Sequence, residues 1–503
     1  MVFVMGGLHA QSPSTYLVAD FSADGLEQML ELCGESGVSA LLQSAPFSSY
    51  GHYQWNPDFA QEGDRSVARM VDVAAGKGVQ LGIFAQTDAI SLNDAYFAPR
   101  YFHRMKRSGR VDLFDWIAAD QREFALLPNE VFSQPSSLNL MLVDGELLSY
   151  GTMEPARDVV LLYRCNRGMY GTAAADHQAN AEAFKLWDAP GRFVAPDGSL
   201  RDSVQWNLAQ RIEAARLPFV KYSGDQGLNK VEGSVRVRQL ESWERQRDSL
   251  KASDQPLELG WFTLRASEGR QASTTMEELE WFLSKAAALQ AGYGLVIDRS
   301  AIQRHGQLHR MLALVKAWNQ VRDADVLTKE QRDDLLDPYA DWHLEPCGEN
   351  SYLLYPVYLS RRYRCAFTDK GPHQETAMQW KSSAPRPVAF SVEVKGQGEI
   401  IGPTLVIGAD TLHFSCNVKA DQTLHCGFNG KASVMDADHR VLKELSVEVQ
   451  PFLQEDVSEV TLSYEIKGNK KVPDVSVRYL IREQPIPIQV GDKRPVEPDK
   501  TTD

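Results

Sequence analysis

The sequence predicts an α/β fold of the (β/α)8 TIM-barrel type, with a complete or an incomplete set of strands, followed by a C-terminal β-sandwich. Short apolar runs alternate with helical stretches from about residue 16 to 338, and two of the later runs are followed by a carboxylate. Near residue 341 the helical periodicity stops and short alternating strands take over. Alternation of strands and helices is typical of a parallel sheet covered by helices, and alternating short strands are typical of a sandwich.

Six barrel strands are predicted from the apolar runs. They lie at residues 16–21, 40–46, 81–88, 217–222, 257–263 and 294–298. Helices are predicted at 24–35 and 66–76, where apolar residues recur at helical spacing. A seventh and an eighth strand have no clear pattern. The barrel is therefore either incomplete or has short strands near 325–342.

An inserted β subdomain is predicted between the third and fourth strands, at about 120–172. Asp144-Gly145 between two apolar runs is a hairpin signature. Helices are expected next, at 173–187 and 200–215. These boundaries give a barrel domain at 12–340 and a sandwich domain at 341–483. Residues 484–503 carry several prolines and mixed charges, which predicts a disordered tail.

Composition excludes several classes of function. The chain has 503 residues, with 43% hydrophobic and 24% charged residues, which is typical of a globular protein with a large core. Its net charge of −14 argues against a nucleic-acid partner, because phosphate binding needs a basic surface. No apolar run approaches the roughly 20 residues needed to span a bilayer, so no membrane span is predicted.

The first eleven residues predict a truncated secretory signal. They hold a short apolar region and small residues near a cut site, without a positively charged n-region. A secreted or periplasmic protein is therefore expected, and an irregular strand of a cytosolic protein is the alternative. The cysteines fit either compartment: Cys416 with Cys426 and Cys347 with Cys365 are conceivable pairs. Without a Cys-x-x-Cys pair, neither a zinc site nor another cofactor is expected.

Two carboxylates lie where predicted strands end. Asp225 follows the fourth apolar run and Asp298 follows the sixth. In a parallel barrel, side chains at the carboxyl ends of the strands surround one pocket. Two facing carboxylates are what cleavage of a glycosidic bond requires. The structural alternatives are a helix cap for Asp225 and an ion pair with Arg299 for Asp298.

Polar and aromatic residues near the same strand ends are candidates for substrate binding. Trp261 either stacks on a sugar ring or belongs to the barrel core. The loop from Arg164 to His177 contains glycines and polar residues. Its Arg and His side chains either contact the hydroxyls or the acid group of a sugar, or they form hydrogen bonds within the loop itself. The candidate substrate-binding residues are Tyr222, Trp261, Asn229, Arg164, His177, Asp88, Arg265 and His52.

Several of these stretches resemble secreted polysaccharide-degrading proteins of gut and marine bacteria, similar to distant members of the α-galactosidase-like barrel clan. The resemblance rests on Tyr16-Leu-Val-Ala-Asp-Phe-Ser, Gly51-His-Tyr, Gly82 with Asp88, Arg167-Gly-Met-Tyr-Gly-Thr and Asp225. In that clan an Asp ending strand four is the nucleophile and an Asp ending strand six is the acid/base, which implies these roles for Asp225 and Asp298. The chain departs from the pattern where Gln226 and Asn229 replace an expected acidic residue and where a His is missing after the third strand.

The resemblance implies a glycoside hydrolase that acts on an oligosaccharide or polysaccharide with retention. Two carboxyl groups about 5–5.5 Å apart would fit retention, and about 6.5–9.5 Å would fit inversion. Two alternatives remain open. The departures favour a non-catalytic carbohydrate-binding barrel, and a polysaccharide lyase acting on a uronate would use Tyr222 or His177 as base with Arg164. Arg and His around Tyr222 would favour the lyase.

Overall fold

The computed structural model describes residues 14–128, 130, 137–189, 193–222, 234–250, 256–368, 371–446, 450–467 and 472–491. Asp225, Asn229, the predicted signal and most of the predicted tail lie outside these residues. The chain divides into two compact units. The first comprises Met1–Ser12, Asp20–Gln28 and Leu42–Ser223, and the second comprises Pro13–Ala19, Met29–Leu41 and Gly224–Asp503.

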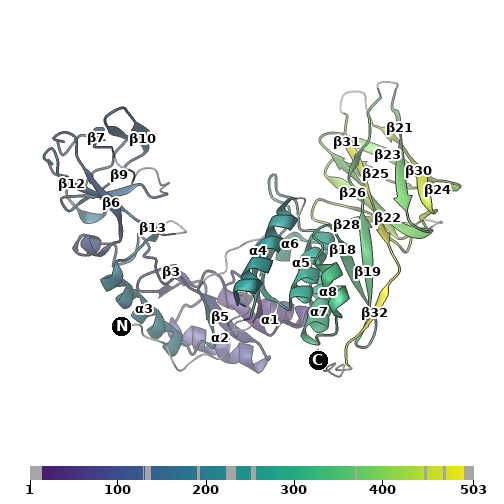
Figure 1. The fold of residues 1–503 in the computed structure, drawn as a ribbon, viewed down its shortest axis with the longest axis horizontal. Coiled ribbons are helices and arrows are strands. Elements are labelled where there is room, and N and C mark those ends of the chain that lie inside the picture. Colours follow the sequence, from purple (N-terminus) through teal and green to yellow (C-terminus); the bar gives the residue numbers. More distant parts are fainter. Residues whose placement is uncertain are drawn as a thin grey trace, which may run out of the picture. The chain divides into compact units, whose positions relative to one another are not determined.

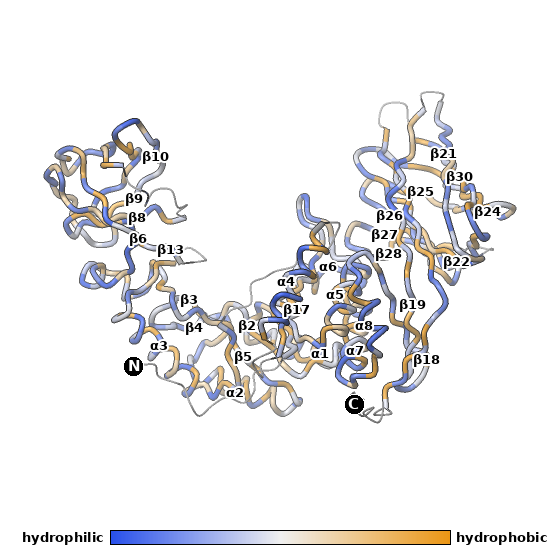
Figure 2. The backbone as a smooth tube through the Cα atoms, in the orientation of Figure 1, coloured by the Kyte–Doolittle hydropathy of each residue, from blue (hydrophilic) through white to orange (hydrophobic). Residues whose placement is uncertain are grey.

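All six predicted barrel strands belong to one six-stranded parallel sheet. Its order is β15 (Val220–Lys221), β5 (Gln80–Phe84), β2 (Ala40–Gln43), β1 (Thr15–Ala19), β17 (Gly292–Ile297) and β16 (Glu258–Leu264). These strands form because they are short apolar runs whose residues are largely buried, as in β1 and β2. In Figure 2 the tube through β5 is largely orange, the colour of hydrophobic residues.

The pairing of β17 corrects the strand count. β17 pairs in parallel with β1, with Tyr16 opposite Gly294, and β16 pairs with the other side of β17. In a closed barrel the neighbour of the first strand is the last strand, so β17 has the position of a last strand rather than a sixth. The alternative of short barrel strands at 325–342 does not hold, because that segment contains α8 (Lys329–Leu335) and the first residues of β18, a strand of the sandwich sheet.

Helices accompany the parallel strands. They are α1 (Leu26–Ser36), α2 (Asp64–Gly76), α3 (Gly198–Ala214), α4 (Ser234–Leu250), α5 (Met276–Leu289), α6 (Arg299–Arg304), α7 (Leu308–Asp323) and α8. A capping box between Thr275 and Glu278 begins α5. Phe282 of α5 stacks on Phe262 of β16, with ring centroids 4.8 Å apart. In Figure 1, α5 and α7 lie beside β18.

The segment in which the inserted β subdomain is predicted forms antiparallel strands, and these strands extend beyond the predicted range. They are β6 (Arg107–Asp112), β7 (Phe124–Leu126), β8 (Leu140–Val143), β9 (Glu146–Ser149), β10 (Thr152–Pro155), β11 (Val160–Tyr163) and β12 (Glu182–Leu186). β8 and β9 form the hairpin predicted from Asp144-Gly145. The helix expected at 173–187 is wrong, because Ala183 and Lys185 are buried with strand periodicity and pair with β8.

The C-terminal region is the predicted all-β structure. The larger sheet has the order β18-β19-β31-β22-β26-β27-β28, with β20, β29 and β32 attached, and the smaller sheet has the order β21-β30-β23-β24, with β25 attached. The bounds are β18 (Asp341–Gly348), β19 (Ser351–Leu359), β20 (Tyr363–Arg364), β21 (His373–Ser382), β22 (Arg386–Lys395), β23 (Glu399–Ile407), β24 (Asp410–His413), β25 (Asn417–Lys419), β26 (Gln422–Cys426), β27 (Ala432–Met435), β28 (Val441–Leu445), β29 (Phe452–Leu453), β30 (Asp456–Ile466), β31 (Asp474–Arg482) and β32 (Ile486–Gln489).

Two expectations about this region need correction. β32 pairs with β19, so the predicted tail begins with an ordered strand whose Ile488 is buried. All six cysteines lie among the described residues and each is a free thiol, so neither conceivable pair forms a disulfide. Cys347 is exposed, while Cys416 and Cys426 are buried separately in the sandwich.

Candidate functional site

A short hairpin follows β2 and carries the first functional side chain, His52. Its strands are β3 (Phe47–Ser49) and β4 (Gln54–Trp55), with Phe47 opposite Trp55. The turn contains Gly51 at φ +120°, where a Cβ atom would lie 2.6 Å from Oδ1 of Asp94. Only glycine therefore allows the turn to approach this carboxylate.

Asp94 holds the ring of His52. The Asp94 side chain is fully buried and accepts hydrogen bonds from Ser49 Oγ at 3.1 Å, from the backbone N–H of His52 at 2.9 Å and from that of Tyr96 at 2.9 Å. Its Oδ1 is also 2.7 Å from Nδ1 of His52. A carboxylate only accepts hydrogen bonds, so Nδ1 of His52 carries the ring hydrogen and donates the hydrogen bond to Asp94. Nε2 is then the ring atom available to a substrate.

Aromatic and amide groups fix the orientation of His52. The imidazole stacks on Tyr96, with centroids 4.0 Å apart and planes at 27°. Asn207 of α3 donates to Gly51 O at 2.9 Å and to Tyr96 Oη at 3.2 Å. The His52 side chain is 37% exposed, so the ring is held on one side and open on the other.

Tyrosines connect the hairpin with the ends of β5 and β15. Tyr53 Oη donates to Gln86 O at 2.6 Å. Burial, followed by the charges of Tyr50, Tyr222 and nearby carboxylates, raises the pKa of Tyr53. Tyr222 is the residue after β15 and is 43% exposed. These side chains come from the carboxyl ends of β2, β5 and β15, the edge at which parallel α/β sheets bind ligands.

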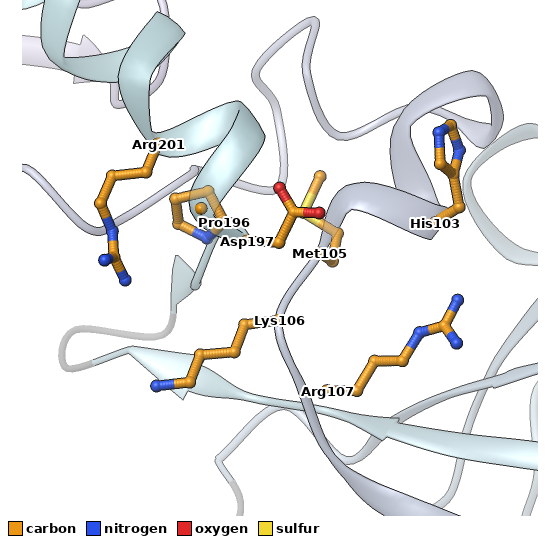
Figure 3. Close-up of a pocket in the computed structure, with 8 residues that line it drawn as sticks. His103, Met105, Lys106, Arg107, Pro196, Asp197 and Arg201 are labelled. Atoms are coloured by element: carbon orange, nitrogen blue, oxygen red, sulfur yellow. The ribbon is translucent and has the colours of Figure 1, made fainter. Parts of the chain in front are cut away.

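A basic pocket of about 490 Å³ adjoins this region within the first unit. Arg201 of α3 forms an ion pair with Asp88, with 2.8 Å between Nε and Oδ1, and it also lines the pocket. Figure 3 shows Lys106 and Arg201 on one side of Asp197, with His103 and Arg107 on the other. The single carboxylate is already engaged, because Asp197 caps α3 through Leu200 N at 2.9 Å. The pocket therefore favours an anionic group.

The two exposed cations of the pocket are held by aromatic rings. Lys106 Nζ lies 4.4 Å from the ring centroid of Trp187, and the guanidinium of Arg107 lies 3.9 Å from that of Phe184. Such contacts restrict long side chains that would otherwise sample many rotamers.

Three predicted site residues lie in the second unit, and each has a structural role there. Trp261 is 9% exposed and donates from Nε1 to Tyr16 Oη at 3.1 Å, which places it in the core rather than on a sugar-binding platform. Arg265 is 6% exposed and contacts Thr274. Asp298 caps α6, and its Oδ1 accepts from Ser300 N at 2.8 Å. Trp261 and Arg265 are therefore buried, while Asp298 is partly exposed at the start of α6.

Arg164 and His177 belong to the inserted β subdomain. His177 is 3% exposed and bonds to Glu146 at 2.8 Å and to Asp144 at 3.0 Å. Glu146 also receives two hydrogen bonds from Arg167, both 2.8 Å long. His177 therefore fits the alternative of a satisfied loop, because a buried network uses both ring nitrogens. Arg164 is exposed after β11, at φ +54°.

Three of the predicted residues, His52, Asp88 and Tyr222, lie in the first unit, in the segments that follow β2, β5 and β15. The distance between the carboxyl groups of Asp225 and Asp298 stays a prediction, because Asp225 lies outside the described residues. Sequence reasoning missed Asp94, although it follows the third predicted strand as a carboxylate in a polar loop. Its position after that strand was the feature of the sequence that could have identified Asp94 as a site residue.

Neither a metal centre nor a membrane helix is found in the described part of the chain. No group of three His, Cys, Asp or Glu side chains among these residues is arranged to hold a metal ion. None of the described helices is both long and apolar enough to cross a bilayer.

Comparison with known proteins gives distant structural likenesses. No protein-family model matches the chain, and no curated protein matches it in sequence. One similar solved structure is an α-amylase from Geobacillus thermoleovorans with acarbose, at 10% identity over 90% of this chain and 98% of that chain, with a TM-score of 0.33. Another is a GH36 α-galactosidase from Geobacillus stearothermophilus with stachyose, at 9% identity over 91% of this chain and 56% of that chain, with a TM-score of 0.31. These TM-scores are too low to carry an argument about fold or function.

Proposed function

We propose that the protein is a glycoside hydrolase that acts on a complex polysaccharide, with its active site at the carboxyl ends of β2, β5 and β15. The observation that carries the proposal is the His52 imidazole, which is oriented by the buried Asp94 carboxylate, stacks on Tyr96 and is 37% exposed. Imidazole exchanges protons readily near neutral pH, and a positioned imidazole accelerates proton transfer about 10²–10⁴-fold.

In the proposed reaction His52 transfers a proton between Nε2 and the glycosidic oxygen. Asp94 stabilises the imidazolium, since its charge lies next to Nδ1. Tyr222 and Asp88 bind sugar hydroxyls. Asp225, three residues beyond Tyr222 in the sequence, keeps the role of nucleophile that the sequence predicts, and a covalent intermediate would retain the anomeric configuration. Asp298 has no part in this scheme because it caps α6.

A polysaccharide lyase is the second candidate, and the basic pocket favours it. A lyase must neutralise the carboxylate of a uronate and abstract the adjacent proton. Lys106 and Arg107 supply positive charge, whereas Arg201 is already paired with Asp88. His52 supplies a base. This assignment replaces His177, whose ring nitrogens are both bonded in the inserted β subdomain.

Product analysis tests both candidates. The wild type and the His52→Gln and Asp225→Asn variants are incubated with plant, algal and host glycans, and reducing ends and ultraviolet absorbance of unsaturated uronates are recorded. New reducing ends without absorbance, reduced at least about 10²-fold in both variants, support the hydrolase. Absorbance that depends on His52 but not on Asp225 supports the lyase. Binding without either product would leave a non-catalytic carbohydrate-binding protein.

A further inference from the structure

The first unit contains a basic segment, residues 99–110, shortly after Asp94 in the chain. The segment holds five Arg or Lys side chains and no Asp or Glu, in a chain whose net charge is −14. Its structure is a 3₁₀ helix, η2 (Pro99–Arg104), followed by the first residues of β6. Positive charge that is concentrated on one short segment of an acidic protein attracts anions to that place. The basic segment is therefore a candidate binding surface for an anionic ligand.

The backbone of the basic segment is held in place by buried side chains and by the neighbouring chain. Phe102 and Met105 are each 1% exposed, and the ring of Phe102 packs against Phe97 with centroids 5.1 Å apart. The N–H of Lys106 donates to Ala195 O at 2.9 Å. A surface that is already fixed binds a ligand without the cost of ordering its backbone.

Three of the five cations are exposed and form no ion pair with a carboxylate of the described residues. They are Arg100, Lys106 and Arg107. The guanidinium of Arg100 lies 4.8 Å from the ring centroid of Tyr101, and the other two cations lie over the rings described above. A cation over an aromatic ring keeps its charge and its donors for a ligand. Arg110 differs, because it forms ion pairs with Asp112 and Glu182.

A series of ring contacts connects the basic segment with His52. The imidazole stacks on Tyr96, and the ring of Tyr96 meets that of Tyr101 edge-on, with centroids 5.3 Å apart and planes at 87°. Tyr101 in turn carries the guanidinium of Arg100. Both tyrosines are partly exposed. A polymer bound at His52 can therefore extend over the tyrosines to the cations without leaving the first unit.

We infer that the basic segment binds an acidic polysaccharide, with Arg100, Lys106 and Arg107 contacting its carboxylates or sulfate esters. The inference rests on the proposed function, because it names the substrate class of that site. Three separate cations match anionic groups that repeat along a polymer, and the assignment holds whether the glycosidic bond is hydrolysed or eliminated. The net charge of −14 opposes a nucleic acid, whose densely spaced phosphates would meet the acidic remainder of the surface.

Isothermal titration calorimetry on the full chain tests the inference. Hexagalacturonate probes carboxylate binding, a κ-carrageenan hexasaccharide probes sulfate-ester binding, and maltohexaose is the neutral chain of the same length. We expect saturable binding of at least one acidic probe, weaker binding of maltohexaose, and a loss of affinity as the salt concentration is raised. The acidic probe that binds more tightly identifies the anionic group. A single-stranded DNA oligomer is titrated as a phosphate polymer and is expected to bind more weakly than that probe.

Glutamine variants locate the binding on the basic segment. Each of Arg100→Gln, Lys106→Gln and Arg107→Gln removes one exposed cation and is expected to raise Kd about threefold, and the combined variant is expected to raise it at least about tenfold. Arg110→Gln is the matched control, because it changes the charge of the same segment by the same amount at a cation that is already paired. Its Kd is expected to stay at the wild-type value. Thermal melts check that each variant folds.

The inference is overturned if neither acidic probe binds, if maltohexaose or the DNA binds more tightly than both, or if the combined variant keeps the wild-type Kd. It is also overturned if Arg110→Gln raises Kd as much as Lys106→Gln does. The His52→Gln variant is expected to keep binding the acidic probe while losing activity. Binding of an acidic probe without cleavage of any glycan would refute the proposed function alone. Cleavage of a neutral glycan by a protein that binds no acidic probe would refute the inference alone.

Discussion

Replacing Asp94 by Asn removes the charge that orients His52 while keeping the size of the side chain. Oδ1 of Asp94 faces the Tyr96 N–H and Nδ1 of His52, and Oδ2 faces Ser49 Oγ and the backbone N–H of His52. Whichever oxygen position the amide NH2 takes, it meets one backbone N–H. The variant therefore has a donor facing a donor in either orientation.

The magnitude follows from that geometry. A buried polar group left without its partner costs about 1–3 kcal/mol, and the lost charge weakens the remaining hydrogen bonds. We expect Asp94→Asn to lower the free energy of unfolding by about 2 kcal/mol. Activity is expected to fall about 10²-fold, because the imidazole loses both its fixed orientation and the charge that stabilises its protonated form.

A double-mutant cycle provides the assay. kcat/KM on a cleaved glycan is measured for Asp94→Asn, His52→Gln and the double variant, with urea unfolding of each as control. If the two residues act as a unit, the double variant is no slower than His52→Gln alone. Activity of Asp94→Asn within about threefold of the wild type, or fully additive losses, would refute the role of the pair.

Three further predictions concern stability. Gly51→Ala places a Cβ 2.6 Å from the Asp94 carboxylate at φ +120°, so we expect a loss above about 1 kcal/mol and reduced kcat, checked by thermal melting and assay. Burial opposes ionisation of Glu146, but hydrogen bonds from Arg167, the backbone and His177 outweigh it and hold its pKa at about 2. The stabilisation is therefore present above pH 4.5, the ordinary value, and is lost as the pH falls toward 2. Glu146→Gln should remove this dependence in urea titrations and cost about 3 kcal/mol at pH 7, because Arg167 stays buried and unpaired. Burial lowers the pKa of Lys285 to about 7, so the folded state binds fewer protons than the unfolded state and stability should rise between pH 7 and 10. Lys285→Met should abolish that rise, measured by urea unfolding across the same range.

The six parallel strands were predictable because each is a local apolar run, whereas their order was not. Strand pairing is decided by residues far apart in the chain, such as Tyr16 opposite Gly294. The burial of Trp261 also depends on a residue far away in the chain. A Cβ at Gly294 would lie 2.4 Å from the Trp261 ring, so this glycine makes the room that buries the indole. Neither neighbour is visible in the sequence around Trp261.

The candidate site was predictable only in part for a related reason. His52 and Asp94 are 42 residues apart, and the contact depends on a hairpin turn and a loop that have no motif of their own. His177 illustrates the opposite case. It lies in a polar, glycine-containing loop of the kind that binds substrates, but its partner Glu146 is 31 residues away in a strand. A polar loop residue is open to substrate only when no buried partner uses it.

A variant of Asp298 distinguishes two interpretations of β17. One counts β17 as the sixth barrel strand, and the other follows its observed pairing with β1. If β17 ended a sixth barrel strand, Asp298 would be the acid/base and Asp298→Asn would abolish activity. In the structure its carboxylate caps α6 through Ser300 N, and asparagine caps a helix as well as aspartate does. We therefore expect Asp298→Asn to keep both activity and melting temperature, while Asp298→Ala costs about 1 kcal/mol in urea unfolding without changing kcat. Loss of activity in Asp298→Asn with an unchanged melt would contradict this, because the charge would then act in chemistry and not only at the cap. The proton donor would in that case be Asp298 rather than His52.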